Sequence, residues 1–488
     1  MNSQLLISAS LLLPILGILF ISLARKNANL REISTLIVSM ALIYVVYSLL
    51  PDVLNGIYPE LYLFDVTSNL VIHFQVEPLG MVFACVASFL WLINSIYSIG
   101  YMRANKYKNQ TRFYIYFALA IASTIGIAFS ANLFTLFIFY EFLTLSTYPL
   151  VTHKETEEVK RSGRVYLGIL LATSICLFLP AIIWTYQLTG SIHFTPGGVF
   201  DKYEDPVIIL CLLLIFVYGI GKAALMPVHR WLPSAMVAPT PVSALLHAVA
   251  VVKAGVFSVV KIIIYIFSPS LLSNTIDVNV LLYLSGATIL VASIIALRSD
   301  NLKRRLAYST ISQLSYVILA TALLVPISIM GAVLHIVAHA FGKITLFFAA
   351  GAIYTTTKKT KVSQLNGIGK SMPWTMLAFA IGSLSMIGIP PTAGFLSKWF
   401  ILQGALDIEA WFAVSIIVIS TLLNAAYFLP IVYVAFFRNS EIQRDRVYHE
   451  APFPIVFTVF STACITIILF FFPDIPLQLA KLLIGENI

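Results

Sequence analysis

Charged residues are scarce in this sequence of 488 residues: only 10% are Asp, Glu, Lys or Arg, and 59% are hydrophobic. A soluble domain carries roughly a quarter charged residues, so a soluble fold of this length is excluded. The apolar residues come in blocks of about 20, the helical length that crosses a hydrocarbon core of ~30 Å. The sequence therefore predicts an all-α integral membrane protein with multiple membrane passes.

Cysteine motifs and nucleotide fingerprints are also missing. The four cysteines, Cys85, Cys176, Cys211 and Cys464, form no CxxC pair and no Cys/His cluster with metal-ligand spacing. No glycine-rich dinucleotide fingerprint, phosphate loop or long soluble stretch is present. We therefore expect no cofactor, no metal site and no redox or catalytic centre in the chain itself. Energy input is expected from an ion gradient or a partner subunit.

The apolar blocks predict about fourteen transmembrane helices. The first, near residues 4–23, has no basic region before it and no small-residue cleavage signature after it, so we expect a retained helix rather than a signal peptide. The expected spans are 4–23, 32–50, 78–99, 112–130, 131–152, 163–187, 206–231, 241–267, 279–297, 306–324, 327–354, 373–402, 411–437 and 453–472.

The loops alternate in charge, which predicts the orientation of the chain. Most of the 30 lysines and arginines lie near residues 25–31, 103–112, 154–164, 230, 298–305, 358–370 and 438–446. The opposite loops hold Lys202 and Lys481 with many acids: Asp52, Glu60, Asp65, Asp201, Glu204, Asp205, Asp277, Asp407 and Glu409. By the positive-inside rule, the basic loops are expected in the cytoplasm and both termini on the outer side.

A few charged residues fall inside the apolar spans instead of the loops. They are Glu141, Lys222, Lys253, Lys261, Lys343 and Lys398. An ionisable group at mid-bilayer costs about 2.5–3.5 kcal/mol, so such groups normally face a bundle interior, a partner charge or water. For Glu141 the alternatives are a static ion pair between two helices and a role in ion conduction. One acid among several lysines favours a proton relay.

Two expected spans are interrupted beside a buried lysine. Pro227 follows Lys222 in the seventh span, and Pro390 and Pro391 precede Lys398 in the twelfth. Proline removes a backbone hydrogen bond, and broken spans at matching places in two halves indicate an inverted repeat with its ion site at the breaks. The alternative is two unrelated proline kinks. The expected domains are 1–111 (helices 1–3), 112–267 (helices 4–8), 268–437 (helices 9–13) and 438–488 (helix 14 and tail).

The eighth and eleventh spans carry further ionisable groups. His335, His339 and Lys343 are spaced by four, which predicts one helix face over roughly 12 Å. Histidine titrates near neutral pH and can accept and pass a proton, so this stripe is typical of a transfer path, with a structural role as the alternative. Lys253 lies too deep to reach the interface, whereas Lys261 is expected to extend its stem to the outer interface.

The segments Lys222–His247 and Gly388–Lys398 resemble the antiporter-like subunits of respiratory complex I and the multisubunit (Mrp-type) cation/proton antiporters. Residues Ala238–Phe257 are most similar to an antiporter-like subunit of the Mrp type. The resemblance covers essentially the whole chain. It implies a glutamate–lysine pair (Glu141, Lys222), a lysine leading to the centre (Lys253), and a half-channel of His335, His339, Lys343 and Lys398. Some complex I subunits have glutamate where this chain has Lys398, and the longest relatives extend beyond the final helix into a lateral helix.

This resemblance implies a proton-translocating membrane subunit of a multisubunit Na⁺/H⁺ antiporter in the bacterial cytoplasmic (inner) membrane. The expected partners are other membrane subunits, the lipid bilayer, H⁺ and Na⁺ or another monovalent cation, and no nucleic acid. The alternative from another class is a proton-pumping subunit of an NADH:quinone oxidoreductase. A structural scaffold is a third hypothesis, which the mid-membrane charges disfavour.

Overall fold

Long apolar helices dominate the chain, as the computed structural model shows for residues 3–67, 70–200, 205–275, 279–438 and 449–485. Within these residues, 11 helical segments are long and apolar enough to cross a membrane. They are Ser3–Leu23 (α1), Ala28–Leu54 (α2), Pro78–Ala104 (α3), Gln110–Ala128 (α4), Leu133–Val151 (α5), Glu157–Thr189 (α6, η1 and α7), Thr240–Phe267 (α10, η5, α11 and η6), Asn279–Arg298 (α13), Pro326–Thr357 (α15), Trp411–Phe437 (α19) and Phe453–Phe471 (α20).

Three further helices lie where the remaining spans were expected. They are Pro206–Gly219 (α8), Leu302–Ala322 (α14) and Pro373–Ile387 (α17), the last continued by Ala393–Asp407 (α18). The shorter helices are Trp231–Ser234 (α9), Pro269–Thr275 (α12), Ile368–Ser371 (α16) and Asp474–Leu483 (α21). The helical membrane class is confirmed, whereas the total of fourteen spans stays a prediction.

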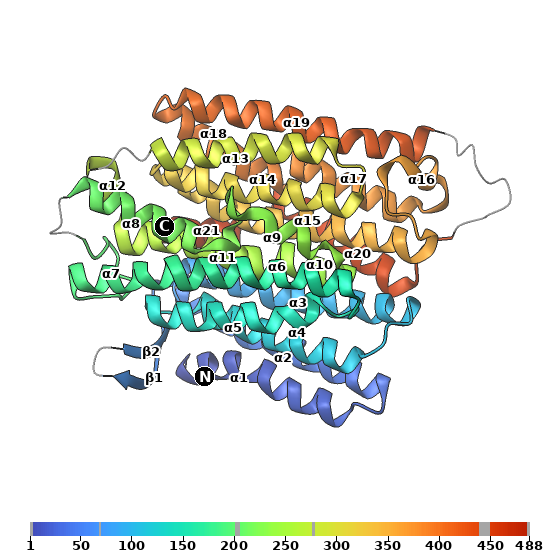
Figure 1. Ribbon diagram of the computed structural model, residues 1–488, viewed down its shortest axis with the longest axis horizontal. Helices are drawn as coiled ribbons and strands as arrows, with labels where there is room; N and C mark the ends of the chain where they lie inside the picture. The colour runs from blue at the N-terminus through green and yellow to red at the C-terminus, as the bar shows by residue number, and fades with distance from the viewer. Residues whose placement is uncertain (1–2, 68–69, 201–204, 276–278, 439–448, 486–488) are drawn as a thin grey trace.

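The helices run roughly parallel to the long axis of the molecule (Figure 1). The most apolar window is fully buried in α15 and in the Thr240–Phe267 segment, but only 33–44% buried in α1, α2 and α20. The two buried segments therefore form the centre of the bundle. They carry Lys253, His335, His339 and Lys343.

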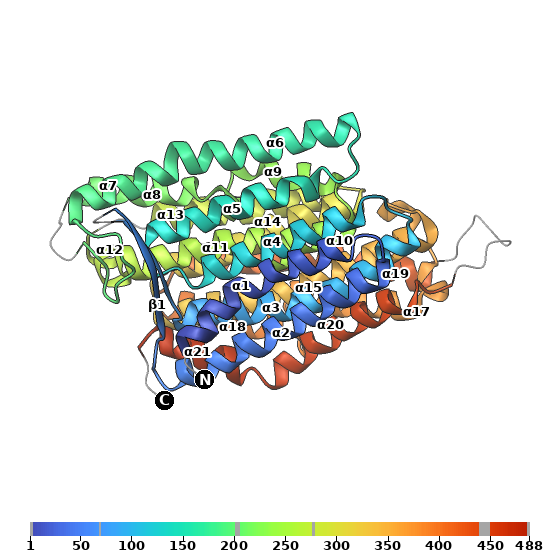
Figure 2. The same cartoon turned by 90° about the horizontal axis from the view of Figure 1, so that it is seen from below.

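One end of the bundle holds the start of α1 together with α7, α12 and α21 (Figure 2). The loops of the other end contact one another: Lys358 donates a hydrogen bond to Asn105, Asn301 pairs with Lys361, and Arg112 forms an ion pair with Glu155. We call this second end the basic end, because it holds the basic loops. Of the expected loop charges, Asp201, Lys202, Glu204, Asp277, Arg444 and Arg446 lie outside the described residues.

Both expected breaks are present. Helix α8 ends at Gly219, and the chain continues through a short 3-10 turn, Gly221–Ala223 (η2), another at Val228–Arg230 (η3), and α9. The last residue of α8 therefore lies eight residues before Pro227, the residue that the sequence indicated as the cause of the break. Helix α17 ends at Ile387, and Gly388 has φ +90°, a left-handed conformation in which glycine is favoured.

A two-stranded antiparallel β-hairpin was not expected. Its strands, Glu60–Thr67 (β1) and Leu70–Gln75 (β2), lie at the same end as the start of α1 (Figure 2). Gln75 and Phe129 join the hairpin to the end of α4 through a backbone hydrogen bond of 2.7 Å. The hairpin thus packs onto the bundle, which a loop between two spans would not require.

Candidate functional site

A connected group of buried lysines and histidines occupies the centre of the bundle. The ammonium Nζ of Lys253, on α11 (Val251–Ile262), lies 2.8 Å from Nδ1 of His339 on α15. Both side chains are at most 1% exposed. The rings of His339 and His335, one turn apart on α15, have centroids 6.2 Å apart. The structure therefore brings together Lys253 from one predicted span and the two histidines from another.

The group continues to the break between α17 and α18. Nδ1 of His335 lies 2.8 Å from the hydroxyl of Ser397, in the first turns of α18. The neighbouring Lys398 donates hydrogen bonds of 2.9 Å to the carbonyls of Met386 and Ile387, the last residues of α17. Because α17 ends there, these carbonyls have no helical N–H partner, and the lysine satisfies them.

An aromatic ring connects the same residues from a third helix. The ammonium of Lys398 lies 4.9 Å from the centre of the Tyr316 ring on α14, and that ring is 5.7 Å from His335. A cation over an aromatic face is stabilised by the ring quadrupole. Tyr316 was not recognised from the sequence, since a tyrosine within an apolar span is an ordinary core residue.

Lys343 leaves the expected stripe. Its ammonium donates a 2.8 Å hydrogen bond to the hydroxyl of Ser309 on α14, which also accepts one from Tyr427 on α19. Eight residues turn an α-helix by about 80° beyond two full turns, so Lys343 points to other neighbours than His335 does. The stripe therefore divides, with the histidines facing Lys253 and α18, and Lys343 facing α14 and α19.

Lys222 is fully buried at the first break. Its ammonium donates hydrogen bonds to the carbonyl of Tyr140 (2.8 Å) and the hydroxyl of Thr144 (2.6 Å), both on α5, and lies 3.1 Å from the centre of the Tyr140 ring. The lysine thus has only neutral partners in direct contact. Gly255 on α11 permits this position, because a Cβ there would collide with the backbone of Lys222 and Ala223.

Glu141 lies next to these partners on α5 but does not bind the lysine. Both carboxylate oxygens are buried, and neither has a hydrogen-bond partner among the described residues. Glu141 nevertheless directly follows Tyr140, whose carbonyl and ring contact the ammonium of Lys222. The two members of the expected pair are therefore neighbours, but they form no ion pair in this arrangement. A buried carboxylate without a partner is costly, and such an atom in a native fold needs an explanation.

Two buried ionisable groups did not stand out in the sequence. Both ring nitrogens of His247, in the π-helical turn Leu245–Val249 (η5), lack a hydrogen-bond partner among the described residues, and its ring lies 4.7 Å from Phe347 on α15. Glu77 precedes Pro78, at the boundary of a loop and an apolar span. It caps α3 by accepting hydrogen bonds from the backbone of Leu79 and Gly80.

The expectation that Lys261 extends to the interface is wrong. Its side chain is 1% exposed, and its ammonium forms an ion pair of 3.1 Å with the 7% exposed carboxylate of Glu77. It also donates to the carbonyl of Ser130 at 2.7 Å, and Tyr265 donates to the same carboxylate at 3.1 Å. The lysine points inwards because an acid at the start of α3 supplies a buried partner.

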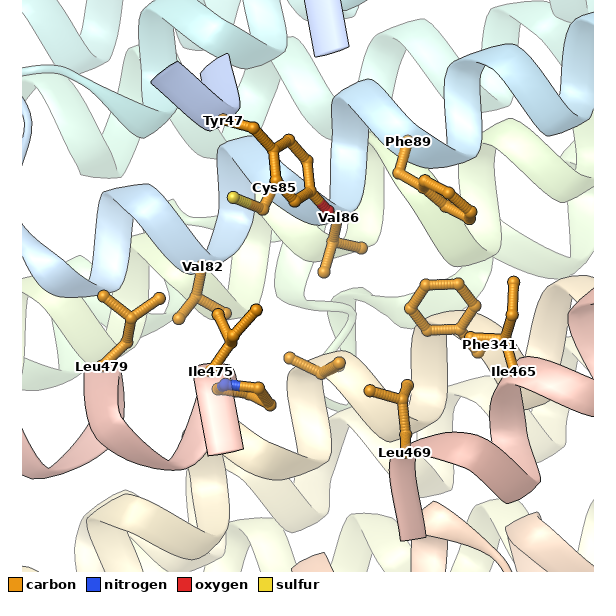
Figure 3. Close-up of a pocket in the computed structure, with 12 residues that line it drawn as sticks. Tyr47, Val82, Cys85, Val86, Phe89, Phe341, Ile465, Leu469, Ile475 and Leu479 are labelled. Carbon is orange, nitrogen blue, oxygen red and sulfur yellow. The ribbon is translucent and has the colours of Figure 1, made fainter. Parts of the chain in front are cut away.

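A separate cavity of about 200 Å³ lies between α2, α3, α15, α20 and α21 (Figure 3). Its lining is apolar apart from the Tyr47 hydroxyl and the Cys85 thiol, with Phe89, Phe341 and Leu469 among the walls. None of its lining residues is charged, so it is distinct from the lysine and histidine group. Within the described part of the chain, no group of three or more His, Cys, Asp or Glu side chains could hold a metal ion.

Residues 130–424 match the family described as NADH:quinone oxidoreductase/Mrp antiporter, transmembrane. NADH-quinone oxidoreductase subunit N of Desulforudis audaxviator is 35% identical over 378 residues, which are 75% of this chain and 73% of that protein. The chloroplastic NAD(P)H-quinone oxidoreductase subunit 5 of Barbarea verna is 30% identical over 451 residues, 87% of this chain but only 58% of that protein.

Two solved structures share the fold over nearly the whole chain. A chain of the Mrp complex from Dietzia sp. superposes with a TM-score of 0.87 at 21% identity, covering 99% of this chain and 97% of that one. A chain of the membrane-bound sulfane sulfur reductase, an archaeal respiratory membrane complex, gives 0.86 at 21% identity, with 98% and 97% covered. The chain therefore belongs to the NADH:quinone oxidoreductase/Mrp antiporter family, as an antiporter-like membrane subunit.

Proposed function

We propose that this chain moves protons through its buried lysines and histidines as a subunit of a multisubunit Na⁺/H⁺ antiporter. The observation that carries the proposal is the contact of Lys253 with His339, which continues through His335 to Ser397 beside Lys398. The proposed relay residues are Glu141, Lys222, Lys253, His335, His339, Lys343 and Lys398. Buried groups that can each hold or release a proton, placed in sequence across a bundle, are typical of proton relays.

The contact between Lys253 and His339 supports the first transfer of the proposed relay. A charged ammonium donates its hydrogen bond to the unprotonated Nδ1, so His339 is then neutral with its proton on Nε2. Transfer to Nδ1 and release from Nε2 would move a proton towards His335. Because the rings are 6.2 Å apart between centroids, this second step needs a bridging water or a ring rotation.

Glu141 and Lys222 are suited to gate the relay. In the arrangement described, the lysine binds only neutral groups and the carboxylate has no partner. A movement that closes the pair would favour the charged ammonium, and reopening it would favour proton release. Two such arrangements, each favoured in a different protonation state, are the minimum for a switch.

The two breaks support an inverted repeat between expected spans 4–8 (residues 112–267) and expected spans 9–13 (residues 268–437). The ammonium of Lys222, at the first break, lies over the ring of Tyr140 on α5, and that of Lys398, at the second, lies over Tyr316 on α14. Helices α5 and α14 are the second members of the two proposed blocks. Equivalent lysine–tyrosine contacts at equivalent positions favour a repeat over unrelated proline kinks. We propose domain boundaries at 111, 267 and 437.

Support for cation exchange comes from the match to the Mrp complex chain, which is covered over 97% of its length. The second candidate is a proton-pumping subunit of a redox complex, favoured by the 35% identity to a quinone oxidoreductase subunit. Both candidates assign partner membrane subunits and the same proton-carrying residues to the chain. They differ in what drives the protons.

Purification of the intact complex separates the two candidates. Copurified small membrane subunits without redox centres, together with ΔpH-driven Na⁺ exchange in vesicles, would support the antiporter. Flavin or iron–sulfur subunits and electron-driven proton movement would support the pump. Glu141→Ala and Lys222→Ala are each expected to abolish exchange while the complex still assembles. Normal exchange by either variant would contradict the relay.

A further inference from the structure

A polar cavity of about 300 Å³ opens at the basic end of the bundle. Its walls come from the α5–α6 connection, the segment before α10, the start of α14 and the end of α15. The polar lining includes Lys154, Lys303, Lys359, Thr240, Asn301 and Tyr354. No Asp or Glu is among the residues that line it. Three cationic side chains therefore share a cavity whose walls offer no carboxylate.

Lys303 is held at the cavity wall by the local fold. Asn301 caps α14 by accepting a hydrogen bond from the backbone of Arg304, which fixes the first turn of the helix. From that turn, the ammonium of Lys303 donates a 2.6 Å hydrogen bond to the carbonyl of Ala238. An ammonium has three donors, so this bond leaves further donors for a ligand.

The charges in the cavity are crowded. Burial lowers the pKa of Lys303 to about 7, and the positive charge of Lys154 contributes to this lowering. Burial also lowers the pKa of Lys154, a shift that Glu158 at the start of α6 opposes. Removing a cation from water is costly, so an anion bound in the cavity would stabilise both lysines in their charged form.

Phosphate oxygens match this arrangement. Lysine is a common phosphate ligand through its point charge, and hydroxyl and amide groups such as those of Thr240 and Asn301 can donate to the remaining oxygens. The cavity lies where α10 and α14 begin and α15 ends, at the level expected for lipid headgroups. Basic pockets between transmembrane helices at the cytoplasmic side bind anionic headgroups in other membrane proteins.

We propose that the cavity between the α5–α6 connection, α10, α14 and α15 binds a phosphate group, which an anionic phospholipid headgroup or free phosphate can supply. This site lies apart from the proton relay and does not depend on the direction or driving force of transport. It goes beyond the proposed function because it assigns the basic end a specific ligand.

The test measures lipid binding to the intact complex in detergent by native mass spectrometry. Wild type, Lys154→Gln, Lys303→Gln, Lys303→Arg and Lys160→Gln are titrated with phosphatidylglycerol, phosphatidylcholine or inorganic phosphate. Lys160 is the matched control, because it lies on the same end, pairs with Glu157 and does not line the cavity. Losing one charge-assisted contact is expected to weaken binding about tenfold in both glutamine variants. The arginine variant and Lys160→Gln should bind as wild type does.

The ligands used in the titrations identify the source of the phosphate. Binding of phosphatidylglycerol that inorganic phosphate does not displace supports a lipid ligand, and displacement by millimolar phosphate supports a site for the free ion. Either result supports the proposal if the binding is weakened by Lys154→Gln and by Lys303→Gln. Equal binding to wild type and both glutamine variants would overturn it. So would equal losses in Lys160→Gln, because that result indicates attraction to the basic end as a whole.

Discussion

Single buried side chains carry the proposed transport, and His339 is the sharpest test among them. His339→Gln keeps a side chain of similar size and an acceptor for Lys253, but it cannot bind and release a proton. We expect proton-coupled exchange to fall by about a hundredfold or more, the scale of losing a positioned acid or base. The measurement is the exchange rate in vesicles. His193→Gln, in an exposed loop, is the control and should exchange normally.

The ion pair between Lys261 and Glu77 predicts a loss of stability instead. Lys261→Met leaves a buried carboxylate without its charge partner, which costs about 3–5 kcal/mol. The melting temperature of the purified complex should fall. The double variant Glu77→Gln/Lys261→Met removes both charges and should recover much of the loss, since a glutamine oxygen can still cap α3. A double variant less stable than Lys261→Met would contradict the pairing.

The lowered pKa of Lys303 predicts unusual reactivity. An amine reacts with acylating reagents only in its neutral form, and the pKa of Lys303 is about 7. Its reaction rate should rise between about pH 6 and 8 and then level off. Lys160 should react progressively faster well above that range, because its hydrogen bond to Glu157 raises its pKa. Labelling followed by peptide mass spectrometry compares the two, and parallel profiles would contradict the lowered pKa.

The identity of the buried charged residues could be read from the sequence, but not all of their partners. Lys253, His335 and His339 stood out because ionisable groups are rare in apolar spans. The contact between Lys253 and His339 joins residues 86 apart, which no local spacing encodes. Glu77 escaped notice because Pro78 begins the apolar span directly after it. Its partner Lys261 was consequently expected at the interface.

Close packing of helix backbones positions the first break, and one glycine tests it. Gly255→Ala would place a Cβ against the backbone of Lys222 and Ala223, where no flexible side chain can yield. We expect about 1–3 kcal/mol of destabilisation and a marked loss of exchange because Lys222 moves. Gly168→Ala is the matched control: on this helical glycine of α6, an added Cβ meets nothing within 4 Å beyond the adjacent residues and backbone of its own helix. Normal exchange by Gly255→Ala would show that the position of Lys222 is not critical.

At the level of whole elements, hydropathy predicted the helices well and their interruptions less well. The expected span 411–437 coincides with α19, and 241–267 differs by one residue from the observed segment. The first break was expected at Pro227, but α8 already ends at Gly219. Side chains replace helical hydrogen bonds there: the Tyr140 hydroxyl accepts one from the Lys222 N–H, and the Trp231 indole donates one to the Gly221 carbonyl. The β-hairpin was missed because its two short strands lie in a loop that hydropathy leaves undefined.

The whole molecule presents two ends of different character, which predicts its orientation in the membrane. The basic end is expected in the cytoplasm, because loops rich in lysine and arginine stay on that side. The start of α1 and helix α21 lie at the opposite end (Figure 2). Labelling with a membrane-impermeant maleimide tests this in a background whose four native cysteines are replaced by serine. His193→Cys marks the outer end, and Lys108→Cys marks the basic end; both positions are exposed.

In intact cells, the reagent reaches only the outer surface. The His193→Cys variant should therefore be labelled, whereas the Lys108→Cys variant should react only after the membrane is permeabilised. The two sites lie on loops separated by α4 to α7, so a single inverted or missing span would change their relation. Labelling of 108 alone would reverse the orientation and place both termini inside. Labelling of both in intact cells would contradict the number of crossings between them. Only the expected result puts the proposed phosphate cavity on the cytoplasmic leaflet, where Lys154 and Lys303 can meet its anionic lipids.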